Sequence, residues 1–283
     1  MYDKELLDSI KINEKYFIEL IQERLGIVVH IHQTKELCDA VAEACINLNC
    51  NPHEYLEKIK TCTTDSPLLE FLVTSITIGE TSFFRDKRQM KLLQNTLLPR
   101  LIRAKQESGD LSIRIWSAGC STGEEIYTIA MMLISLIPAI SAWNLNLLGT
   151  DINRTSLNKA KAGIYSRWSM RSIPDYYLNR YFSLEDKAYK LSSEVKNLVH
   201  FSHLNLTEHS YPSILNGTVA QDLILCRNVM IYFDNDHIAQ IMNQFSQCLD
   251  ASGFLILGAS DPINISETPF IFHHEEAIYF SKN

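Results

Sequence analysis

The chain has 283 residues, enough for two domains of ordinary size, each able to bury a hydrophobic core of its own. Apolar residues make up 46% of the sequence and charged residues 21%, a composition typical of folded globular domains and unlike that of disordered chains. The formal net charge of −7 provides no general basic surface, so nucleic acid is not expected as a partner.

Neither membrane insertion nor secretion is expected. The longest apolar stretch, residues 129–140, spans about a dozen positions, whereas a membrane-spanning helix needs about twenty. The N-terminus carries Asp3, Lys4 and Glu5, which is unlike the basic start of a secretory signal. The seven cysteines include no Cys-x-x-Cys pair, so we expect reduced, mostly buried thiols in a cytoplasmic protein.

Residues 1–70 are predicted to form an all-helical domain. Hydrophobic residues recur at intervals of three and four up to Leu25, and Gly26 then provides a typical helix C-cap. Three further helices are predicted after the first, over residues 35–48, after the N-cap pair Asn51 and Pro52, and over residues 68–78. Residues 71–110 are expected to form a linker and a helix that lead into the next domain.

From residue 111 onward the sequence alternates strands with helices, which is typical of a mostly parallel sheet covered by helices. Residues 165–198 interrupt this alternation and predict an inserted subdomain with a small antiparallel sheet around residues 189–191. We therefore expect an α/β domain over residues 111–283 that binds its ligand at the carboxyl ends of the strands. Strands are predicted at 111–116, 145–149, 199–204, 222–226, 254–258 and 277–281, and helices at 125–137, 155–162 and 236–249.

A glycine-bearing turn joins the first predicted strand to the helix that follows. From Ser117 to Glu125 it reads Ser-Ala-Gly-Cys-Ser-Thr-Gly-Glu-Glu, so its glycines are spaced G-x-x-x-G and not G-x-G-x-x-G as in dinucleotide-binding proteins. The two glutamates would repel a phosphate and attract a cation, such as a sulfonium cofactor with a free amino group. The alternative is a purely structural turn whose acidic residues stabilise the helix dipole.

Polar residues follow the other predicted strands as well. Asp151 ends the second strand, where a carboxylate can accept hydrogen bonds from both ribose hydroxyls of an adenosine. Asn205 and Asn228 follow two later strands, and Tyr232 lies a few residues farther on. Each residue alone is a weak signal, but parallel strands bring such residues to the same edge of a sheet. Together they favour a site for a sulfonium cofactor that contains adenosine.

No metal site is predicted. His30 and His32 lie close together in the sequence, and His273 is followed by His274, but packed or surface histidines are the better interpretation of both pairs than a zinc site.

Four segments, in this order, resemble the chemotaxis receptor methyltransferases of the CheR type, which are protein-glutamate O-methyltransferases. The resemblance covers nearly the whole chain. It implies an N-terminal helical domain, a linker, and a Rossmann-like class I S-adenosylmethionine (SAM) domain that carries a small inserted β-subdomain. The segments are TIGETSFFRD at 77–86, AGCSTGEE at 118–125, GTDIN at 149–153 and CRNVMIYFD at 226–234.

The resemblance also implies roles for individual residues. Thr81 and Arg85 would contact the cofactor or the incoming carboxylate, and Tyr232 would stand near the transferred methyl group; Arg85 and Tyr232 are the expected catalytic residues. Asp151 would hold the ribose. The residues implied to line the cofactor, from its methionine end to its adenine, are Thr81, Arg85, Gly119, Glu124, Asp151, Ile152, Asn205, Leu206, Asn228 and Val229.

The activity implied is methyl esterification of glutamate side chains on the cytoplasmic domain of a chemoreceptor or a related signalling protein, with S-adenosylhomocysteine as the second product. A glutamate is ionised at neutral pH and needs no general base, and Arg85 could hold it by two hydrogen bonds. Two alternatives remain open, a SAM-binding regulatory protein with weak or no transferase activity and a small-molecule methyltransferase. It is also open whether one group of cations forms a basic face for an acidic partner or is scattered and solvated, namely Arg154, Lys159, Lys161, Arg167, Arg171 and Arg180.

Overall fold

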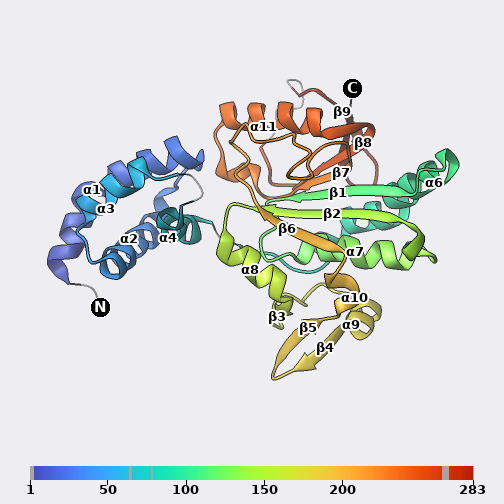
Figure 1. Cartoon of the computed structure of the whole chain (residues 1–283), viewed down its shortest axis with the longest axis horizontal. Coiled ribbons are helices and arrows are strands. Elements are labelled where there is room, and N and C mark those ends of the chain that lie inside the picture. The colour runs from blue at the N-terminus through green and yellow to red at the C-terminus, as the bar shows by residue number, and fades with distance from the viewer. Residues whose placement is uncertain (1–2, 64–65, 78, 263–267, 283) are drawn as a thin grey trace. The chain divides into compact units, whose positions relative to one another are not determined.

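The computed structural model describes residues 3–63, 66–77, 79–262 and 268–282, without the side chain of His32. The chain divides into two compact units (Figure 1). No helix of the described residues is long and apolar enough to cross a membrane. The first unit, called the helical unit below, contains Met1–Ile78 with the short segments Asn153–Thr155 and Tyr232–His237, and the remainder of the chain forms the second, called the sheet unit.

The helical unit is built from amphipathic helices with well-defined ends. As predicted, Gly26 ends the first helix in the left-handed conformation, with a φ of 71°. Asn51 caps the third helix, because its side chain accepts a hydrogen bond from the N–H of Glu54 and the Glu54 carboxylate accepts one from the N–H of Asn51. The predicted helix over 68–78 is α4, and its expected last residue, Ile78, lies outside the described residues. The helices are α1 (Lys4–Leu25), α2 (Thr34–Leu48), α3 (Pro52–Thr61) and α4 (Pro67–Ile76), with a short 3-10 turn η1 (Ile31–Gln33) before α2.

The sheet unit is centred on a seven-stranded sheet with the strand order β6-β2-β1-β7-β8-β10-β9. The first five strands in this order are parallel, whereas β10 runs antiparallel to both of its neighbours. This is the Rossmann-like sheet of class I methyltransferases that the sequence implied. Its strands are β1 (Ser112–Ala118), β2 (Asn144–Asp151), β6 (Val199–His203), β7 (Gln221–Cys226), β8 (Leu249–Leu257), β9 (Phe270–His274) and β10 (Ile278–Lys282).

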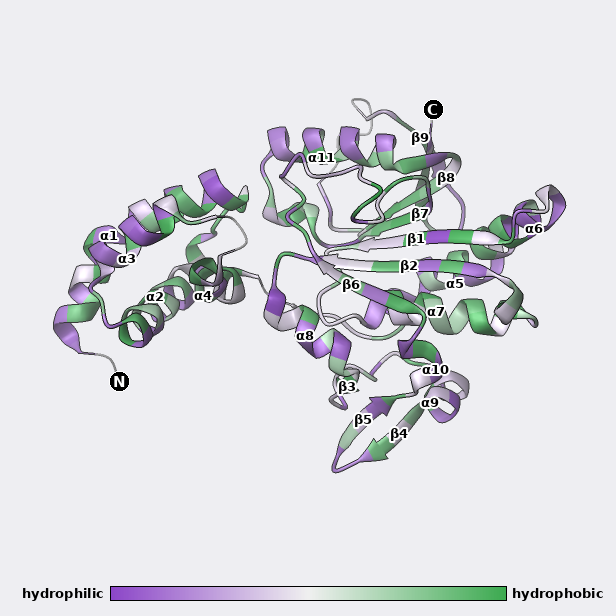
Figure 2. Ribbon diagram, in the orientation of Figure 1, coloured by the Kyte–Doolittle hydropathy of each residue, from purple (hydrophilic) through white to green (hydrophobic). Residues whose placement is uncertain are grey.

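Helices cover both faces of this sheet, with α7 on one face and α11 on the other (Figure 1). Within the sheet unit, the central strand β7, the second half of β8 and the helix α7 are strongly hydrophobic, whereas α8 and α11 carry more hydrophilic residues (Figure 2). The core lies between the sheet and α7, because every residue of β7 is buried and so is nearly all of α7. The helices are α5 (Lys87–Leu92), α6 (Leu98–Ser108), α7 (Glu124–Leu136), α8 (Arg154–Ala162) and α11 (Asn235–Cys248), with a π-helical segment, Leu93–Leu97, between α5 and α6 and short 3-10 turns at Ile140–Ala142 and Met230–Tyr232.

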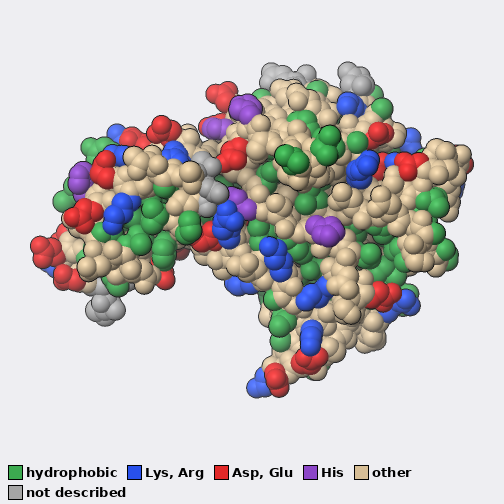
Figure 3. Space-filling model, in the orientation of Figure 1, with side chains coloured by type: hydrophobic (Ala, Val, Ile, Leu, Met, Phe, Trp, Pro, Cys, Tyr) green, Lys and Arg blue, Asp and Glu red, His purple; other side chains and the backbone are tan. Residues whose placement is uncertain are grey.

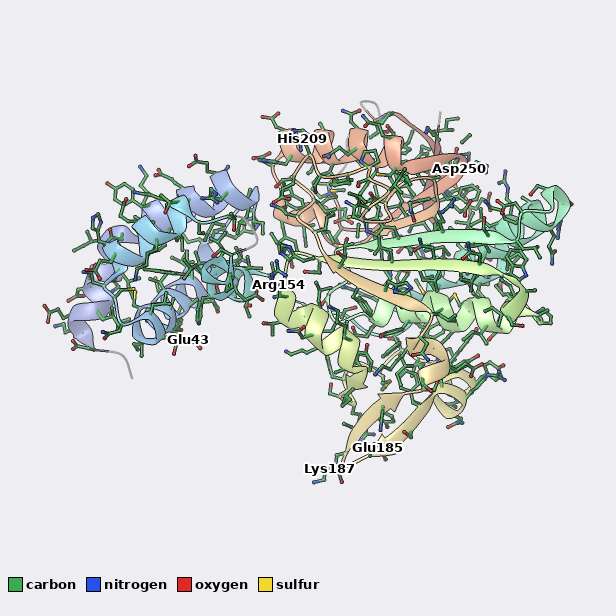
Figure 4. The ribbon with its side chains drawn as sticks, in the orientation of Figure 1. Glu43, Arg154, Glu185, Lys187, His209 and Asp250 are labelled. Carbon is green, nitrogen blue, oxygen red and sulfur yellow. The ribbon has the colours of Figure 1, made fainter. Side chains whose placement is uncertain are left out.

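The predicted insertion contains a three-stranded antiparallel sheet with the order β3-β5-β4. It packs on the rest of the sheet unit through Phe83, whose ring lies edge-on to those of Tyr165 and Phe182, with ring centroids 4.8 and 5.0 Å away. Glu185 and Lys187 lie at the outer tip of its hairpin (Figure 4). The elements are β3 (Ile164–Tyr165), α9 (Asp175–Tyr181), β4 (Phe182–Glu185), β5 (Ala188–Leu191) and α10 (Ser193–Lys196).

Two strands differ from the expectation. The sequence pattern misses β9, because this edge strand is mostly exposed and pairs only with β10, so it has no continuous buried run. The strand predicted at 254–258 begins earlier, at Leu249, which pairs with Gln221 at the start of β7; an irregularity in register separates this pair from the pairing of Leu223 with Phe254. The other predicted strands and helices of this unit agree with the structure to within about two residues, the usual uncertainty of element ends.

Candidate functional site

The candidate site lies in the sheet unit, at the carboxyl ends of neighbouring parallel strands. The strand order reverses between β1 and β7, since β2 and β6 continue the sheet on one side of β1 and β8 continues it beyond β7. Open α/β sheets bind ligands in the crevice at such a reversal. The predicted cofactor residues follow these strand ends or precede α5 in the same unit.

The turn between β1 and α7 is tied to the end of β2. The N–H groups of Gly119 and Cys120 both donate to the carbonyl of Thr150, at 2.8 and 2.9 Å. Gly119 has a φ of 77°, and a Cβ at this position would lie 2.5 Å from a methyl carbon of Val229. Only glycine therefore allows the loop after β7 to approach this closely. The contact brings together Gly119 and Val229, two of the residues predicted to line the cofactor.

Glu124 begins α7 and is almost completely buried, with 1% of its surface exposed. One carboxylate oxygen accepts a hydrogen bond from the Thr122 hydroxyl at 2.6 Å, and the other accepts one from the Ser169 hydroxyl at 3.0 Å. Burial raises the pKa of Glu124, while the two hydroxyl groups and the charge of Arg171 oppose the rise. When ionised, this carboxylate would attract a cationic group more strongly than a solvated one would, because water screens it less.

Asp151 ends β2 beside the same turn and is half-buried. Its Oδ2 atom accepts a hydrogen bond of 2.8 Å from the N–H of Ser121. Ser121 adopts a left-handed backbone, with a φ of 49°, so this hydrogen bond stabilises the turn at an unfavourable conformation. Ile152 follows directly and is also half-buried. The ends of β1 and β2 therefore place Asp151 next to the glycine turn.

Asn205 and Leu206 follow β6, and both are buried. The Oδ1 atom of Asn205 accepts hydrogen bonds from the N–H and the hydroxyl of Thr207, at 3.1 and 3.0 Å. The Nδ2 atom of Asn205 is buried and has no partner among the described residues. A buried donor without a partner costs free energy, which a ligand with a hydrogen-bond acceptor at this position would recover.

The loop that carries Asn228 is held by a carboxylate to which the sequence analysis assigned no role. Asp261 accepts hydrogen bonds from the N–H groups of Asn228, Gly258 and Met230, at 2.8, 2.6 and 3.1 Å. These bonds hold Asn228 in a left-handed conformation, with a φ of 59°. Burial raises the pKa of Asp261, and the backbone donors oppose that rise. The acid three residues after Gly258 was visible in the sequence, but its other two partners, Asn228 and Met230, lie 33 and 31 positions earlier in the chain.

A second arginine fixes the backbone of Arg85. The side chain of Arg227, directly after β7, is only 3% exposed. Its Nη2 atom donates to the carbonyl of Arg85 at 2.8 Å, its Nε atom to Gln89 at 2.6 Å, and its Nη1 atom forms an ion pair with Glu125 at 3.0 Å. Arg227 thus connects β7, α5, α7 and the segment before α5. The sequence shows its place after a strand but not this role.

The Arg85 side chain is half-buried. Its Nη1 atom donates to the carbonyl of Glu80 at 2.6 Å, and no carboxylate pairs with it in the part of the chain that the structure describes. The Nε and Nη2 donors of Arg85 are therefore available to a ligand. Thr81 is also half-buried, and its carbonyl accepts a hydrogen bond from Arg171 at 3.2 Å.

Tyr232 is the predicted residue that the structure groups with the helical unit and not with the others. It ends the 3-10 turn Met230–Tyr232, and its carbonyl accepts a hydrogen bond of 2.8 Å from the N–H of Val28. Its position beside a transferred methyl group stays a prediction.

The residues at these strand ends fit SAM on chemical grounds. Glu124 and Asp151 offer negative charge and acceptor atoms to a cationic amino group and to ribose hydroxyls. The unpartnered Nδ2 atom of Asn205 suits an acceptor such as an adenine ring nitrogen. The carboxylates at the start of α7 would instead repel the pyrophosphate of a dinucleotide.

Comparisons with known proteins identify the family of the chain. Residues 79–278 match the family model described as CheR methyltransferase, SAM binding domain. A chemotaxis protein methyltransferase of Borreliella burgdorferi is 36% identical over 212 residues, which cover 74% of this chain and 73% of that protein. Chemotaxis protein methyltransferase 2 of Vibrio cholerae is 35% identical over 206 residues, covering 72% and 69%. The chemotaxis protein methyltransferase of Escherichia coli is 28% identical over 287 residues, covering 99% and 95%.

Proposed function

Because the chain belongs to the CheR methyltransferase family, and is therefore a SAM-dependent methyltransferase of chemotaxis, we propose that it forms methyl esters on glutamate side chains of a chemoreceptor. The acceptor would be the cytoplasmic domain of the receptor or a related signalling protein. One observation carries the proposal. The guanidinium of Arg85 has no carboxylate partner among the described residues, while its backbone is fixed by the buried side chain of Arg227.

The proposed reaction requires positioning and not a base. When bound, SAM supplies an electrophilic methyl group on a positively charged sulfur. A glutamate side chain is already ionised at neutral pH, so its oxygen can form the new C–O bond while the S–C bond breaks, and no proton is transferred. Holding the two reactants in line contributes up to about 7–11 kcal/mol relative to their encounter in solution.

Arg85 is the residue that would position the acceptor. A guanidinium presents its N–H groups in a planar fork that matches the two oxygens of a carboxylate. Because Nη1 donates to the backbone carbonyl of Glu80, the Nε and Nη2 atoms form the edge of the guanidinium that would bind the acceptor. The hydrogen bond from Arg227 to the Arg85 carbonyl would keep this edge in place during the reaction.

The remaining residues would bind the cofactor. Glu124 would hold its amino group and Asp151 its ribose, while the buried Asn205 amide would donate to the adenine. Tyr232 would stand near the transferred methyl group. The other residues proposed to line the cofactor are Thr81, Gly119, Ile152, Leu206, Asn228 and Val229.

The test is transfer of tritiated methyl groups from SAM to purified cytoplasmic fragments of chemoreceptors. We expect label in the fragment that alkali releases as volatile methanol, because carboxyl methyl esters are base-labile. A fragment with glutamine in place of the modified glutamates is the matched control and should take up no label. Binding of S-adenosylhomocysteine without any transfer would instead favour a regulatory protein, and label on small molecules alone would favour a small-molecule methyltransferase.

A further inference from the structure

An exposed tryptophan and an arginine stacked on it form an unusual surface feature in the insertion. Trp168 lies between β3 and α9, and 64% of its surface is exposed. The guanidinium carbon of Arg171 lies 4.4 Å from the centroid of the indole ring, a cation–π contact. We call these two side chains the Trp168–Arg171 platform. Trp and Arg are enriched among residues that dominate binding energy, and here the two are paired on one surface.

The platform is fixed to the candidate site by its own backbone. The segment forms a helical turn in which the N–H groups of Ser169 and Arg171 donate to carbonyls three residues earlier. The carbonyl of Ser169 accepts a hydrogen bond from the N–H of Phe83 at 3.0 Å, and its hydroxyl donates to Glu124. Phe83 and Glu124 therefore both hold the turn that carries the platform, so it is pre-organised for binding.

Arg171 and Arg85 bind neighbouring groups of the same segment. The Nη1 atom of Arg171 donates to the carbonyl of Thr81 at 3.2 Å, and the Nη1 atom of Arg85 donates to the carbonyl of Glu80 at 2.6 Å. These carbonyls belong to consecutive residues, so both guanidinium groups are bound to one short segment. A protein whose carboxylate is bound by Arg85 therefore approaches the segment to which Arg171 is also bound.

The only ion-pair partner of Arg171 among the described residues is a weak one. Glu80 lies 3.4 Å from its Nη2 atom, and the Glu80 side chain is 59% exposed. Exposed pairs of this kind contribute little to stability, so a carboxylate from a bound protein can replace Glu80 at small cost. The cations Lys159 and Lys161 of α8 are also exposed, and on the face shown in Figure 3 Lys and Arg side chains gather over α8.

We propose that the Trp168–Arg171 platform binds the acceptor protein beside the methylated glutamate and selects acceptors that carry a second acidic residue nearby. Arg171 pairs with this second carboxylate, and the indole of Trp168 packs on the adjoining side chains. The second acid lies within four positions of the methylated glutamate, because residues three or four apart on a helix, or two apart on a strand, share one face. This inference rests on the proposed methylation of glutamate.

Binding of the acceptor, measured apart from catalysis, tests the platform. Receptor cytoplasmic fragments are titrated into the full-length protein in the presence of S-adenosylhomocysteine, which cannot donate a methyl group. We expect Trp168→Ala and Arg171→Ala each to weaken binding by about tenfold or more, the effect of losing a central interface residue. Arg180→Ala is the matched control. Arg180 also stacks on an aromatic ring of the insertion, with its guanidinium carbon 5.2 Å from the centroid of the Tyr181 ring, but it belongs to α9. The affinity of Arg180→Ala for the fragment should stay within twofold of that of the unmodified protein.

A charge exchange separates recognition from loss of folding. Arg171→Glu should bind poorly to the unmodified fragment, and a lysine in place of the second acidic residue of the acceptor should restore binding. Equal affinities for the unmodified protein, Trp168→Ala and Arg171→Ala would overturn the platform, and so would failure of every fragment to bind. A fragment that binds through the platform but receives no base-labile label would instead overturn the proposed function and leave the platform standing.

Discussion

The two compact units differ in the charges they bury. Between residues 3 and 77, the described part of the helical unit buries no Asp, Glu, Lys or Arg side chain, and its interior consists of apolar helix faces. The sheet unit buries Glu124, Asp222 and Arg227. Burying a charge costs several kcal/mol unless it is well partnered, so each of these residues requires a reason.

The partners of the three buried charges supply that reason. Asp222 stabilises the framework, because it accepts a hydrogen bond from the N–H of Arg114 at 2.8 Å and pairs with Lys105 at 2.9 Å. Glu124 and Arg227 lie at the carboxyl end of the sheet, beside the residues proposed to bind cofactor and acceptor. The comparison indicates that a buried charge alone does not mark a site, whereas a buried charge at the strand reversal does.

The largest expected effect is the loss of stability on removing Arg227. Arg227→Met leaves the Glu125 carboxylate without its buried counter-ion, and we expect the free energy of unfolding to fall by about 3–5 kcal/mol. Denaturation followed by tryptophan fluorescence measures this, since all three tryptophans, Trp116, Trp143 and Trp168, belong to the sheet unit.

The matched control for Arg227→Met is Arg24→Met in the helical unit. Among the described residues, Arg24 donates to the carbonyls of Ile59, Lys60 and Cys62 and to no carboxylate, so its loss leaves no described carboxylate without a partner. The fluorescence transition should therefore move far less. Equal shifts for the two variants would show that the buried ion pair of the sheet unit has no special importance.

Arg85→Ala should abolish function with little effect on the fold. We expect the rate of methyl transfer to fall by about 10²–10³-fold, the usual effect of removing one pre-organised charged donor from a reaction centre. Binding of S-adenosylhomocysteine, measured by calorimetry, should remain detectable. The exposed neighbour Arg88 is the control, and Arg88→Ala should keep normal turnover. Near-normal turnover of Arg85→Ala would remove Arg85 from the mechanism.

Asp151→Ala should weaken binding of the cofactor, through loss of the ribose acceptor and of the hydrogen bond that holds the Ser121 turn. Hydrogen bonds to a charged group contribute about 1.5–3 kcal/mol, so the Kd for S-adenosylhomocysteine should rise by about 10- to 100-fold. Calorimetry measures the change, with Asp236→Ala, an exposed acid at the start of α11, as the control. Unchanged affinity in Asp151→Ala would refute the assignment of Asp151 to the ribose.

The buried carboxylate of Glu124 predicts a pH dependence of cofactor affinity. Burial raises its pKa above the ordinary value of 4.5, so it takes up a proton at a higher pH than an exposed glutamate. The protonated carboxyl is neutral and attracts a cationic amino group less, so affinity should fall as the pH is lowered from neutral toward this raised pKa. Glu124→Gln should bind more weakly at neutral pH and lose this dependence. A dependence of the same size in Glu124→Gln would assign it to another group.

The smallest loss of stability is expected for a variant in the helical unit. Asn51→Ala removes the capping box of α3 and should lower the free energy of unfolding by about 1 kcal/mol, measured by far-ultraviolet circular dichroism. The affinity for S-adenosylhomocysteine should not change. A loss as large as that of Arg227→Met would contradict the view that this unit is stabilised by distributed apolar packing and local caps.

Local signals in the sequence predict most of the fold. Gly26 and Asn51 mark helix ends because helix caps depend on a few adjacent residues, and the buried strands β1, β2 and β7 show as apolar runs. The strand β9 was not predicted, because its apolar run, residues 270–272, is only three residues long and its pairing with β10 is a tertiary contact. The roles of Asp261 and Ser169 escape for the same reason, since both bind groups brought close only by the fold.

The sequence by itself determined the α/β architecture, the glycine turn after β1 and the polar residues that follow each strand, because periodicity and turn chemistry act over short distances along the chain. Only the tertiary structure decided how these residues are held. Arg227 reaches Arg85, Gln89 and Glu125 across separations of 142, 138 and 102 positions, and Arg171 reaches Thr81 across 90. Such contacts depend on the order in which strands pair and on where the insertion packs, which no local pattern of residues specifies.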